Sequence, residues 1–234
     1  MALILNIETA EEVCSAGLAR DGKLIDVQES GESRAHATTL TPFIESLMSR
    51  NRLSLSDLDA VAVSKGPGSY TGLRIGVSVA KGICYAADLP LIAVNTLEAL
   101  VVPVAAHKDQ YVKNGETVYY CPMIDARRME VYTTLYDEDL MQVEDIKAKI
   151  LETDFMLKYT QNARVLMFGS GAAKFSKLKA SDKIDIIEGI VPRAENMAPL
   201  AEKAFQTKNF ENTAYFEPFY LKDFIPTVPK NKVL

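Results

Sequence analysis

The sequence predicts a mixed α/β fold, in which helices pack on a sheet that has both antiparallel and parallel strands. Two apolar runs, Ala2–Ile7 and Val13–Arg20, are separated by a short and mostly polar segment, which indicates a β-hairpin. Asp21-Gly22 predicts a tight turn into a third antiparallel strand over 23–29. From there, helical and strand-like segments alternate, as is typical of a sheet covered by helices.

The next segments of the chain justify this alternation one by one. Apolar residues spaced for one face of a helix predict an amphipathic helix around 40–48, and Pro42 suits its first turn. These apolar residues are Leu40, Phe43, Ile44, Leu47 and Met48. A β-branched strand over 59–64 precedes a long helix that reaches about Asp88, and a strand follows over 91–94. Asn95 and Glu98 form a capping box for a third helix.

The second half of the chain has a similar but coarser pattern. Pro103 and the polar stretch 107–116 mark a boundary, so we expect subdomains over 1–103 and 104–225 and a loosely held tail over 226–234. Strands are predicted over 118–124, 130–136, 164–168 and 184–187, and helices near 143–151 and 196–208. The shared strand-then-helix pattern is too coarse to establish a duplication by itself.

Composition excludes several classes of protein. The 234 residues are 48% hydrophobic and 24% charged, as in ordinary globular proteins, and the net charge is −5. Neither half has the basic excess that an autonomous nucleic-acid-binding protein needs. The sequence lacks an apolar run long enough for a transmembrane span and lacks the features of a signal peptide. With three widely spaced cysteines, the expected setting is the cytoplasm, with buried, reduced thiols.

The most informative segment is the glycine-rich stretch 65–76, which connects a predicted strand to the long helix. Such a loop can cradle an anion, because amide groups at a helix N-terminus point outward. However, the glycine spacing is not that of the dinucleotide fingerprint, and no Gly-Lys-Ser/Thr of a P-loop follows. A phosphate site involving Gly66 and Gly68 therefore competes with a purely structural turn.

The helix after this loop is apolar around most of its circumference. Its polar residues form one narrow stripe, Arg74, Ser78, Lys81, Tyr85 and Asp88. Such a helix must be buried on more than one side. Gly72, Gly76 and Ala80 offer a smooth ridge, and two explanations stay open: packing against the 40–48 helix, or a subunit interface. If the ridge is an interface, a bulky residue at Gly76 should block association while leaving the fold largely intact.

Candidates for catalysis are few. The two histidines, His36 and His107, lie far apart, and neither has a neighbouring metal ligand at helical spacing. A Gly-x-Ser-x-Gly elbow is absent from the sequence. Glu8 and Thr9 at the first hairpin could hold a metal–phosphate group, or could simply form a polar turn. We therefore expect neither a catalytic residue nor a metal site in this chain.

Three segments together resemble the TsaB family, also called YeaZ. They are Ile4-Leu5-Asn6-Ile7-Glu8-Thr9, the stretch 64–76 with Ala80-Lys81-Gly82, and Ile124-Asp125-Ala126-Arg127 with Glu130-Val131-Tyr132. The run Gly-Pro-Gly-Ser-Tyr-Thr-Gly-Leu-Arg-Ile-Gly is highly specific. The resemblance is strong over 1–135 and thinner afterwards, although 219–223 is similar to the family's ending.

This resemblance implies an actin-like (ASKHA, ribonuclease H-like) fold of two similar subdomains. It also implies a non-catalytic partner of TsaD, an ASKHA protein that carries a metal and a nucleotide. With the ATPase TsaE, TsaD transfers a threonylcarbamoyl group to the adenosine beside the tRNA anticodon. ATP and Mg²⁺ would then belong to the partner subunits, tRNA would bind only within the complex, and no membrane would be involved.

In this family, the first subdomain's helices contact TsaD, and the same surface can form a homodimer. Mapped onto this sequence, the implied interface comprises His36, Leu40, Pro42, Phe43, Leu47, Tyr70, Gly72, Leu73, Arg74, Gly76, Val77, Ala80, Lys81 and Tyr85.

One departure from the family concerns Glu8, which stands where the family usually has Asp. The longer side chain weakens an ancestral nucleotide role for Glu8, Thr9, Gly66 and Gly68. The competing hypotheses are a stand-alone actin-like nucleotide-binding enzyme and a peptidase.

Overall fold

The first of two five-stranded sheets is built from the N-terminal half of the chain. The computed structural model describes residues 2–30, 36–113, 115–176, 178 and 181–222, so the predicted tail over 226–234 lies outside the described residues. The strands of this sheet are β1 (Leu3–Glu8), β2 (Cys14–Arg20), β3 (Lys23–Ser30), β4 (Ala60–Gly66) and β5 (Leu91–Asn95). Their order is β3-β2-β1-β4-β5. The predicted antiparallel start is confirmed, and β4 and β5 extend the sheet in parallel.

The second sheet repeats this topology. Its strands are β6 (Val118–Asp125), β7 (Glu130–Tyr136), β8 (Gln142–Ile150), β9 (Arg164–Phe168) and β10 (Ile184–Ile187). Their order, β10-β9-β6-β7-β8, is that of the first sheet once it is read from the other edge. Strands β6, β7 and β8 are antiparallel, whereas β9 and β10 are parallel to β6. The two halves are therefore structural duplicates, as an actin-like fold requires.

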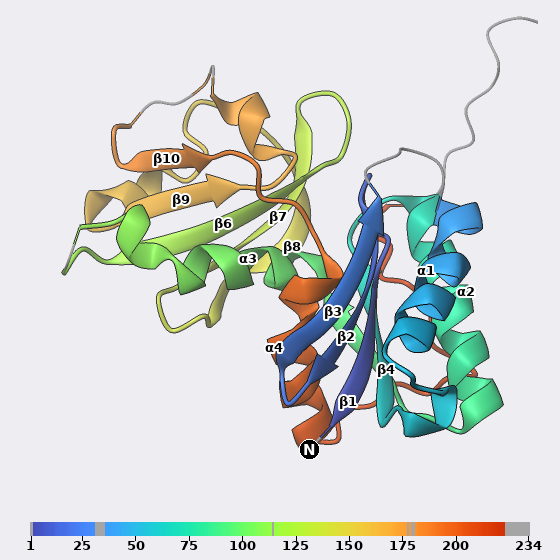
Figure 1. The fold of residues 1–234 in the computed structure, drawn as a ribbon. Coiled ribbons are helices and arrows are strands. Elements are labelled where there is room, and N and C mark those ends of the chain that lie inside the picture. Colours follow the sequence, from blue (N-terminus) through green and yellow to red (C-terminus); the bar gives the residue numbers. More distant parts are fainter. Residues whose placement is uncertain (1, 31–35, 114, 177, 179–180, 223–234) are drawn as a thin grey trace, which may run out of the picture.

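The helices form layers on the two sheets (Figure 1). Helices α1 (His36–Arg50) and α2 (Tyr70–Ala87) cover one face of the first sheet, and α4 (Ala194–Gln206) covers the other. Helix α3 (Thr96–Ala106) packs against the second sheet instead. Helix α3 therefore packs on the sheet that follows it in the sequence, and α4 packs on the sheet that the N-terminal half forms. The subdomain boundary at residue 103 remains a prediction.

Short 3₁₀ helices complete the secondary structure, at Leu55–Asp57, Lys108–Gln110, Leu157–Gln161 and Ala172–Phe175. None of the helices in the described residues combines the length and apolarity needed to cross a bilayer.

One predicted element is wrong. The segment near 143–151 was expected to be helical, but 142–150 forms β8, the edge strand next to β7. Its Glu, Lys and Ala residues favour a helix locally, yet pairing with β7 decides the outcome. Charged side chains such as Lys147 and Lys149 are common on edge strands, because they prevent pairing with other chains.

Helix α2 begins and ends with well-defined caps. The Ser69 hydroxyl accepts from the Gly72 amide at 3.3 Å, which satisfies one of the unpaired amides of the first turn. Asp88 ends the helix in a left-handed conformation with φ of 52°. At the strand end of the preceding loop, Gly66 has φ of +104°, a conformation that side chains other than glycine rarely adopt.

The glycines of α2 face inward, onto the turn between β1 and β2. A Cβ atom added to Gly72 would lie 2.1 Å from the main-chain oxygen of Thr9, and one added to Gly76 would lie 2.3 Å from Thr9 Oγ1. Gly68, in the preceding loop, is similarly close to the turn: a Cβ atom added to it would lie 2.4 Å from the main-chain oxygen of Ala10. Of the two explanations for this ridge, the structure supports internal packing, although the neighbour is the hairpin turn and not α1.

This packing predicts opposite effects for two alanine substitutions in the same helix. Gly72→Ala should lower the free energy of unfolding by about 1–3 kcal/mol, because the methyl group meets rigid backbone. Gly82→Ala should raise it by about 0.8–1 kcal/mol, because nothing lies within 4 Å of the added methyl and alanine is the better helix former. Urea denaturation of both variants checks this, and equal stabilisation by both would contradict the packing.

Candidate functional site

The outer face of α2 is the candidate site. Thr71, Arg74, Ser78, Gly82 and Tyr85 recur at spacings of three or four residues and are all exposed. The opposite side is buried in the first subdomain through Gly72, Leu73, Gly76, Val77, Ala80 and Cys84. The helix therefore has one face committed to the core and another that is open to a partner.

More than half of the residues in the interface implied by the family resemblance are buried in this chain. The buried members of that set belong to the protein's own interior, so their side chains are not available for docking. They are His36, Leu40, Leu47, Gly72, Leu73, Gly76, Val77 and Ala80. A large residue at Gly76 would clash with Thr9, so it would disturb the fold and not test an interface. The implied residues that do reach the surface are Pro42, Phe43, Tyr70, Arg74, Lys81 and Tyr85.

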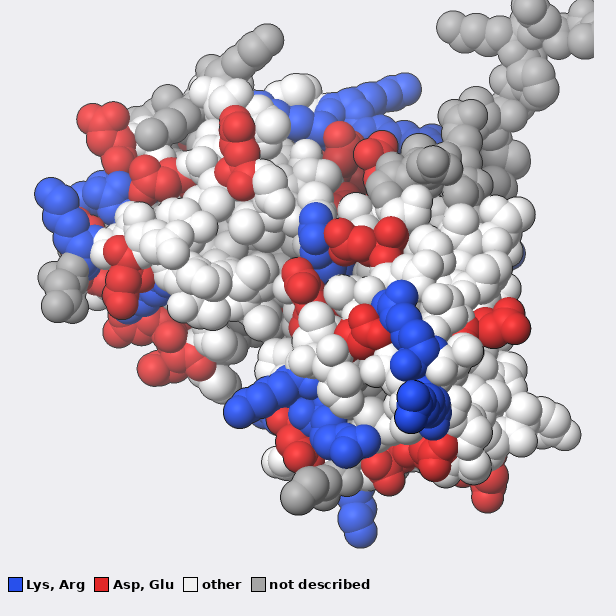
Figure 2. Space-filling model, in the orientation of Figure 1, with Lys and Arg blue, Asp and Glu red and all other residues white. Residues whose placement is uncertain are grey.

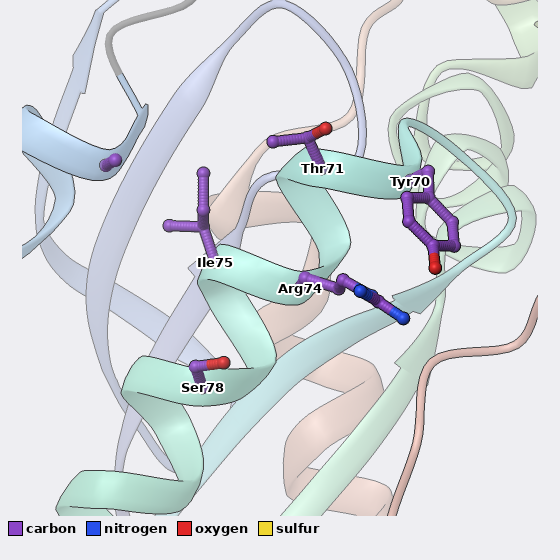
Figure 3. Close-up of a pocket in the computed structure, with 6 residues that line it drawn as sticks. Tyr70, Thr71, Arg74, Ile75 and Ser78 are labelled. Atoms are coloured by element: carbon purple, nitrogen blue, oxygen red, sulfur yellow. The ribbon is translucent and has the colours of Figure 1, made fainter. Parts of the chain in front are cut away.

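On the side nearest α1, the outer face forms a shallow open depression. It is lined by Ala37, Tyr70, Thr71, Arg74, Ile75 and Ser78. Figure 3 shows Thr71, Ile75 and Ser78 projecting from one side of α2, while Arg74 extends toward Tyr70. The region of the surface over α1 is mostly uncharged, as the white area at the right of Figure 2 shows. A mostly uncharged face of this kind is typical of the core of a protein interface.

On its other side, α2 is bordered by the C-terminal segment. The Arg74 guanidinium lies 4.2 Å from the centre of the Tyr70 ring, and Arg74 Nε donates to the Tyr220 hydroxyl at 3.1 Å. Lys81 Nζ donates to the main-chain oxygens of Ala214 and Phe216, at 3.2 and 3.0 Å. Both cations of the predicted polar stripe are therefore held by the chain's own C-terminal segment.

Sequence reasoning missed the contributions of Ala37, Thr71 and Ile75 to this face. The predicted polar stripe lies on the exposed side of α2, but the apolar residues of the helix did not show which of them border it. The positions of the glycines could have done so. Residues 72 and 76, four apart, mark the side of closest approach, and the open face is the side opposite to them.

The structure brings together the four residues considered for nucleotide binding, at the ends of β1 and β4. Glu8 and Thr9 are fully buried. The Ser69 amide donates to Ala10 O at 2.6 Å, so the loop that contains Gly66 and Gly68 lies directly on the hairpin turn. This contact leaves no room for a phosphate group between the loop and residues 9 and 10.

Glu8 and Glu11 form an acidic pair at the junction of the two subdomains. Burial raises the pKa of Glu8 to about 7, although the carboxylate accepts from the Ala10 amide at 2.6 Å. Burial also raises the pKa of Glu11 to about 7, and the charges of Glu8 and Asp125 add to this effect. The Ser170 hydroxyl donates to Glu11 across the junction, which links the hairpin turn to the loop after β9.

Neither histidine is arranged for catalysis. His36 Nε2 lies 2.9 Å from the main-chain oxygen of Glu11, and His107 Nδ1 lies 2.9 Å from that of Pro103. Within the described ranges, no group of three or more His, Cys, Asp or Glu side chains is placed to hold a metal ion. At the turn between β6 and β7, Asp125 accepts from the Arg127 amide at 2.6 Å and pairs with Lys174, which makes it part of a turn.

Comparison with known proteins agrees with this duplicated architecture. The family model of TsaD, described as tRNA N6-adenosine threonylcarbamoyltransferase, matches residues 30–225. The protein "tRNA threonylcarbamoyladenosine biosynthesis protein TsaB" of Escherichia coli (strain K12) is 30% identical over 227 residues, which cover 94% of each chain. Its namesake in Haemophilus influenzae is 28% identical over 229 residues, 94% of this chain and 93% of the relative.

A solved structure matches the fold over the same extent. The protein "YeaZ from Pseudomonas aeruginosa" superposes with a TM-score of 0.80 at 24% identity and covers 94% of this chain and 100% of that one. The two equivalent sheets and the packing of α3 and α4 on them define an actin-like (ASKHA) protein. With its relatives taken into account, the chain belongs to the TsaB family, within the wider group that the TsaD model describes.

The acidic pair predicts how stability depends on pH. Between pH 4.5 and about 7, Glu8 is ionised in the unfolded chain but protonated in the folded one, so the folded state binds more protons. The free energy of unfolding should therefore fall as pH rises through this window. Glu8→Gln should flatten the fall and add on the order of 3 kcal/mol at pH 8, as measured by denaturation across pH.

Glu45→Gln is the control, because Glu45 is exposed on α1 and is not among the groups that shift the pKa of Glu8 or Glu11. It should leave the pH dependence unchanged. A Glu8→Gln variant with the same pH profile as the unsubstituted protein would show that Glu8 is ionised in the folded state.

Proposed function

We propose that this chain is a non-catalytic partner of TsaD in forming threonylcarbamoyladenosine in tRNA. In this reaction, the complex transfers a threonylcarbamoyl group to the adenosine next to the anticodon. The observation that carries the proposal is the match, over 94% of both chains, to a protein whose name states this pathway. The outer face of α2 adds support, because it offers an open and mostly uncharged surface.

Non-catalytic action is the role that the geometry favours. The place between the hairpin turn and the glycine loop is filled by main-chain contacts. We therefore assign ATP and Mg²⁺ to the partner subunits, and we expect no tightly bound cofactor here. On this proposal tRNA binds only within the assembled complex, and TsaE joins it as a further subunit.

The proposed surface for TsaD consists of the outer faces of α1 and α2. We extend the same surface to a homodimer, in which a second copy takes the place of TsaD. The two assemblies would then exclude each other, so that adding TsaD would dissociate the homodimer.

Substitutions on the exposed face test this surface. Thr71→Arg and Ser78→Arg should each weaken binding to TsaD at least tenfold, because a long charged side chain in an uncharged interface must be desolvated without a partner. Both positions are exposed, so the free energy of unfolding should change little. Calorimetric titration against TsaD from the same organism measures the affinity.

Gln206→Arg supplies the control, since Gln206 is an exposed helical position on α4, on the other side of the first sheet. It should bind TsaD as the unsubstituted chain does. If all three variants bind equally well, the surface is elsewhere. A reconstituted tRNA modification assay with and without this chain then tests the function itself.

Nucleotide binding separates the proposal from a stand-alone enzyme. We expect no saturable binding of ATP with Mg²⁺ to the isolated chain at micromolar concentrations, because the hairpin turn and the glycine loop are in direct contact. Micromolar binding that Glu8→Ala abolishes would favour the enzyme instead. Equilibrium dialysis with labelled ATP makes this measurement.

A further inference from the structure

The segment 211–222, which we call the C-terminal strap, runs along the outer side of α2. It leaves the first sheet at Glu211, which pairs with Leu91 of β5. It then passes α2 and reaches β4 and the second subdomain, where Phe219 N donates to Lys65 O at 2.7 Å and Lys222 pairs with Glu130.

Several contacts fix the backbone of the strap. Lys81 holds the main-chain oxygens of Ala214 and Phe216, and the Phe216 side chain packs against the first core. The Tyr220 ring lies 4.8 Å from the Tyr70 ring, between centres. The strap is thus attached along most of its length, and side chains that point away from α2 are presented from a fixed backbone.

Tyr85 lines a shallow groove between α2 and the strap. Its lining consists of Lys81, Tyr85, Asn212, Thr213 and Ala214, and Tyr215 follows directly. The side chains of Tyr85 and Tyr215 are 88% and 84% exposed, although other large apolar side chains of this subdomain are mostly buried. A tyrosine ring so exposed has a large area to bury against a partner.

The groove is continuous with the outer face of α2. At 100° per residue, Tyr85 projects within 20° of Ser78, between the Ile75 side that borders α1 and the Lys81 side that borders the strap. One surface therefore extends from α1 across α2 to the strap, and Tyr85 lies on it in the last turn of α2.

Acidic residues border this surface at both tyrosines. Asp88 follows Tyr85 by three positions at the end of α2, and Glu217 follows Tyr215 by two positions; both are exposed. Carboxylates beside aromatic rings suit a guanidinium or ammonium group, which can stack on the ring and pair with the acid. The same carboxylates, with the net charge of −5, disfavour the phosphates of an RNA.

We infer that Tyr85 and Tyr215 form an anchor for a polypeptide of the protein partner, through a segment that bears arginine or lysine side chains. This inference rests on the proposed function, because it takes the partner to be the protein that docks on α2. It assigns the C-terminal strap a direct part in docking, beyond holding Arg74 and Lys81.

Alanine substitutions on the full-length chain, titrated with purified TsaD by calorimetry, test the anchor. Tyr85→Ala and Tyr215→Ala should each weaken binding about tenfold, as aromatic anchor residues of interfaces do. Asp88→Asn should weaken it less, and only at low salt. Tyr215→Phe should keep most of the affinity. Met141→Ala, at a 65% exposed position of the second subdomain, should bind without change.

The outcomes separate this inference from the proposed function. If Ser78→Arg loses TsaD while both tyrosine variants bind normally, the anchor is overturned and the proposed surface on α2 stands. If Ser78→Arg and both tyrosine variants all bind normally, both are overturned. Weaker retention of tRNA by the tyrosine variants, with TsaD affinity unchanged, would identify RNA as the occupant and would also overturn the inference.

Discussion

The close packing of α2 on the turn between β1 and β2 determines which side chains of the helix are buried and which are exposed. Gly72 and Gly76 let the helix approach Thr9 at distances that any side chain would prevent. This approach brings the loop before α2 onto Ala10, which fills the place where an actin-like protein could hold a phosphate group. It also rotates α2 so that Thr71, Ser78 and Tyr85 face outward. One packing constraint therefore brings the loop onto the turn and leaves the opposite side of α2 exposed.

The duplicated topology explains why the strap, late in the sequence, lies beside α2. Because α4 returns from the second subdomain to cover the first sheet, the residues after it continue beside α2. Arg74 and Lys81 then bind the strap through hydrogen bonds, so these cations are satisfied without a partner. The buried Glu8 and the half-buried Glu11 lie at the inner side of the same turn, where the Ser170 hydroxyl donates to Glu11 and connects the subdomains. The exposed face of α2 is thus free to associate with another protein. The hydrogen bond between Ser170 and Glu11, in contrast, holds the two subdomains together.

Most of the fold could be predicted from the sequence, because strands such as 130–136 and 164–168 carry their pattern locally. The segment 142–150 could not, since pairing with β7 outweighs its helix-favouring residues. For the proposed surface, the sequence indicated α2 and its polar stripe, but it did not separate the apolar residues that are buried from those that are exposed. Leu73, Val77 and Ala80 are no more apolar than Ile75 and Val79, so composition could not orient α2. The contact between Gly72 and Thr9, which are 63 positions apart, orients the helix. The strap's place beside α2 likewise depends on contacts between distant parts of the chain.

The central claim is that the outer face of α2, and not the inner junction, meets the partner. Hydroxyl-radical footprinting of this chain with and without TsaD tests it most directly, because it reads the exposure of individual side chains in the intact complex. The account predicts that Ile75 and Tyr85 lose reactivity when TsaD is added, while the exposed Met141 and Ile150 of the second subdomain stay reactive. Protection of Met141 and Ile150, with Ile75 and Tyr85 unchanged, would contradict it.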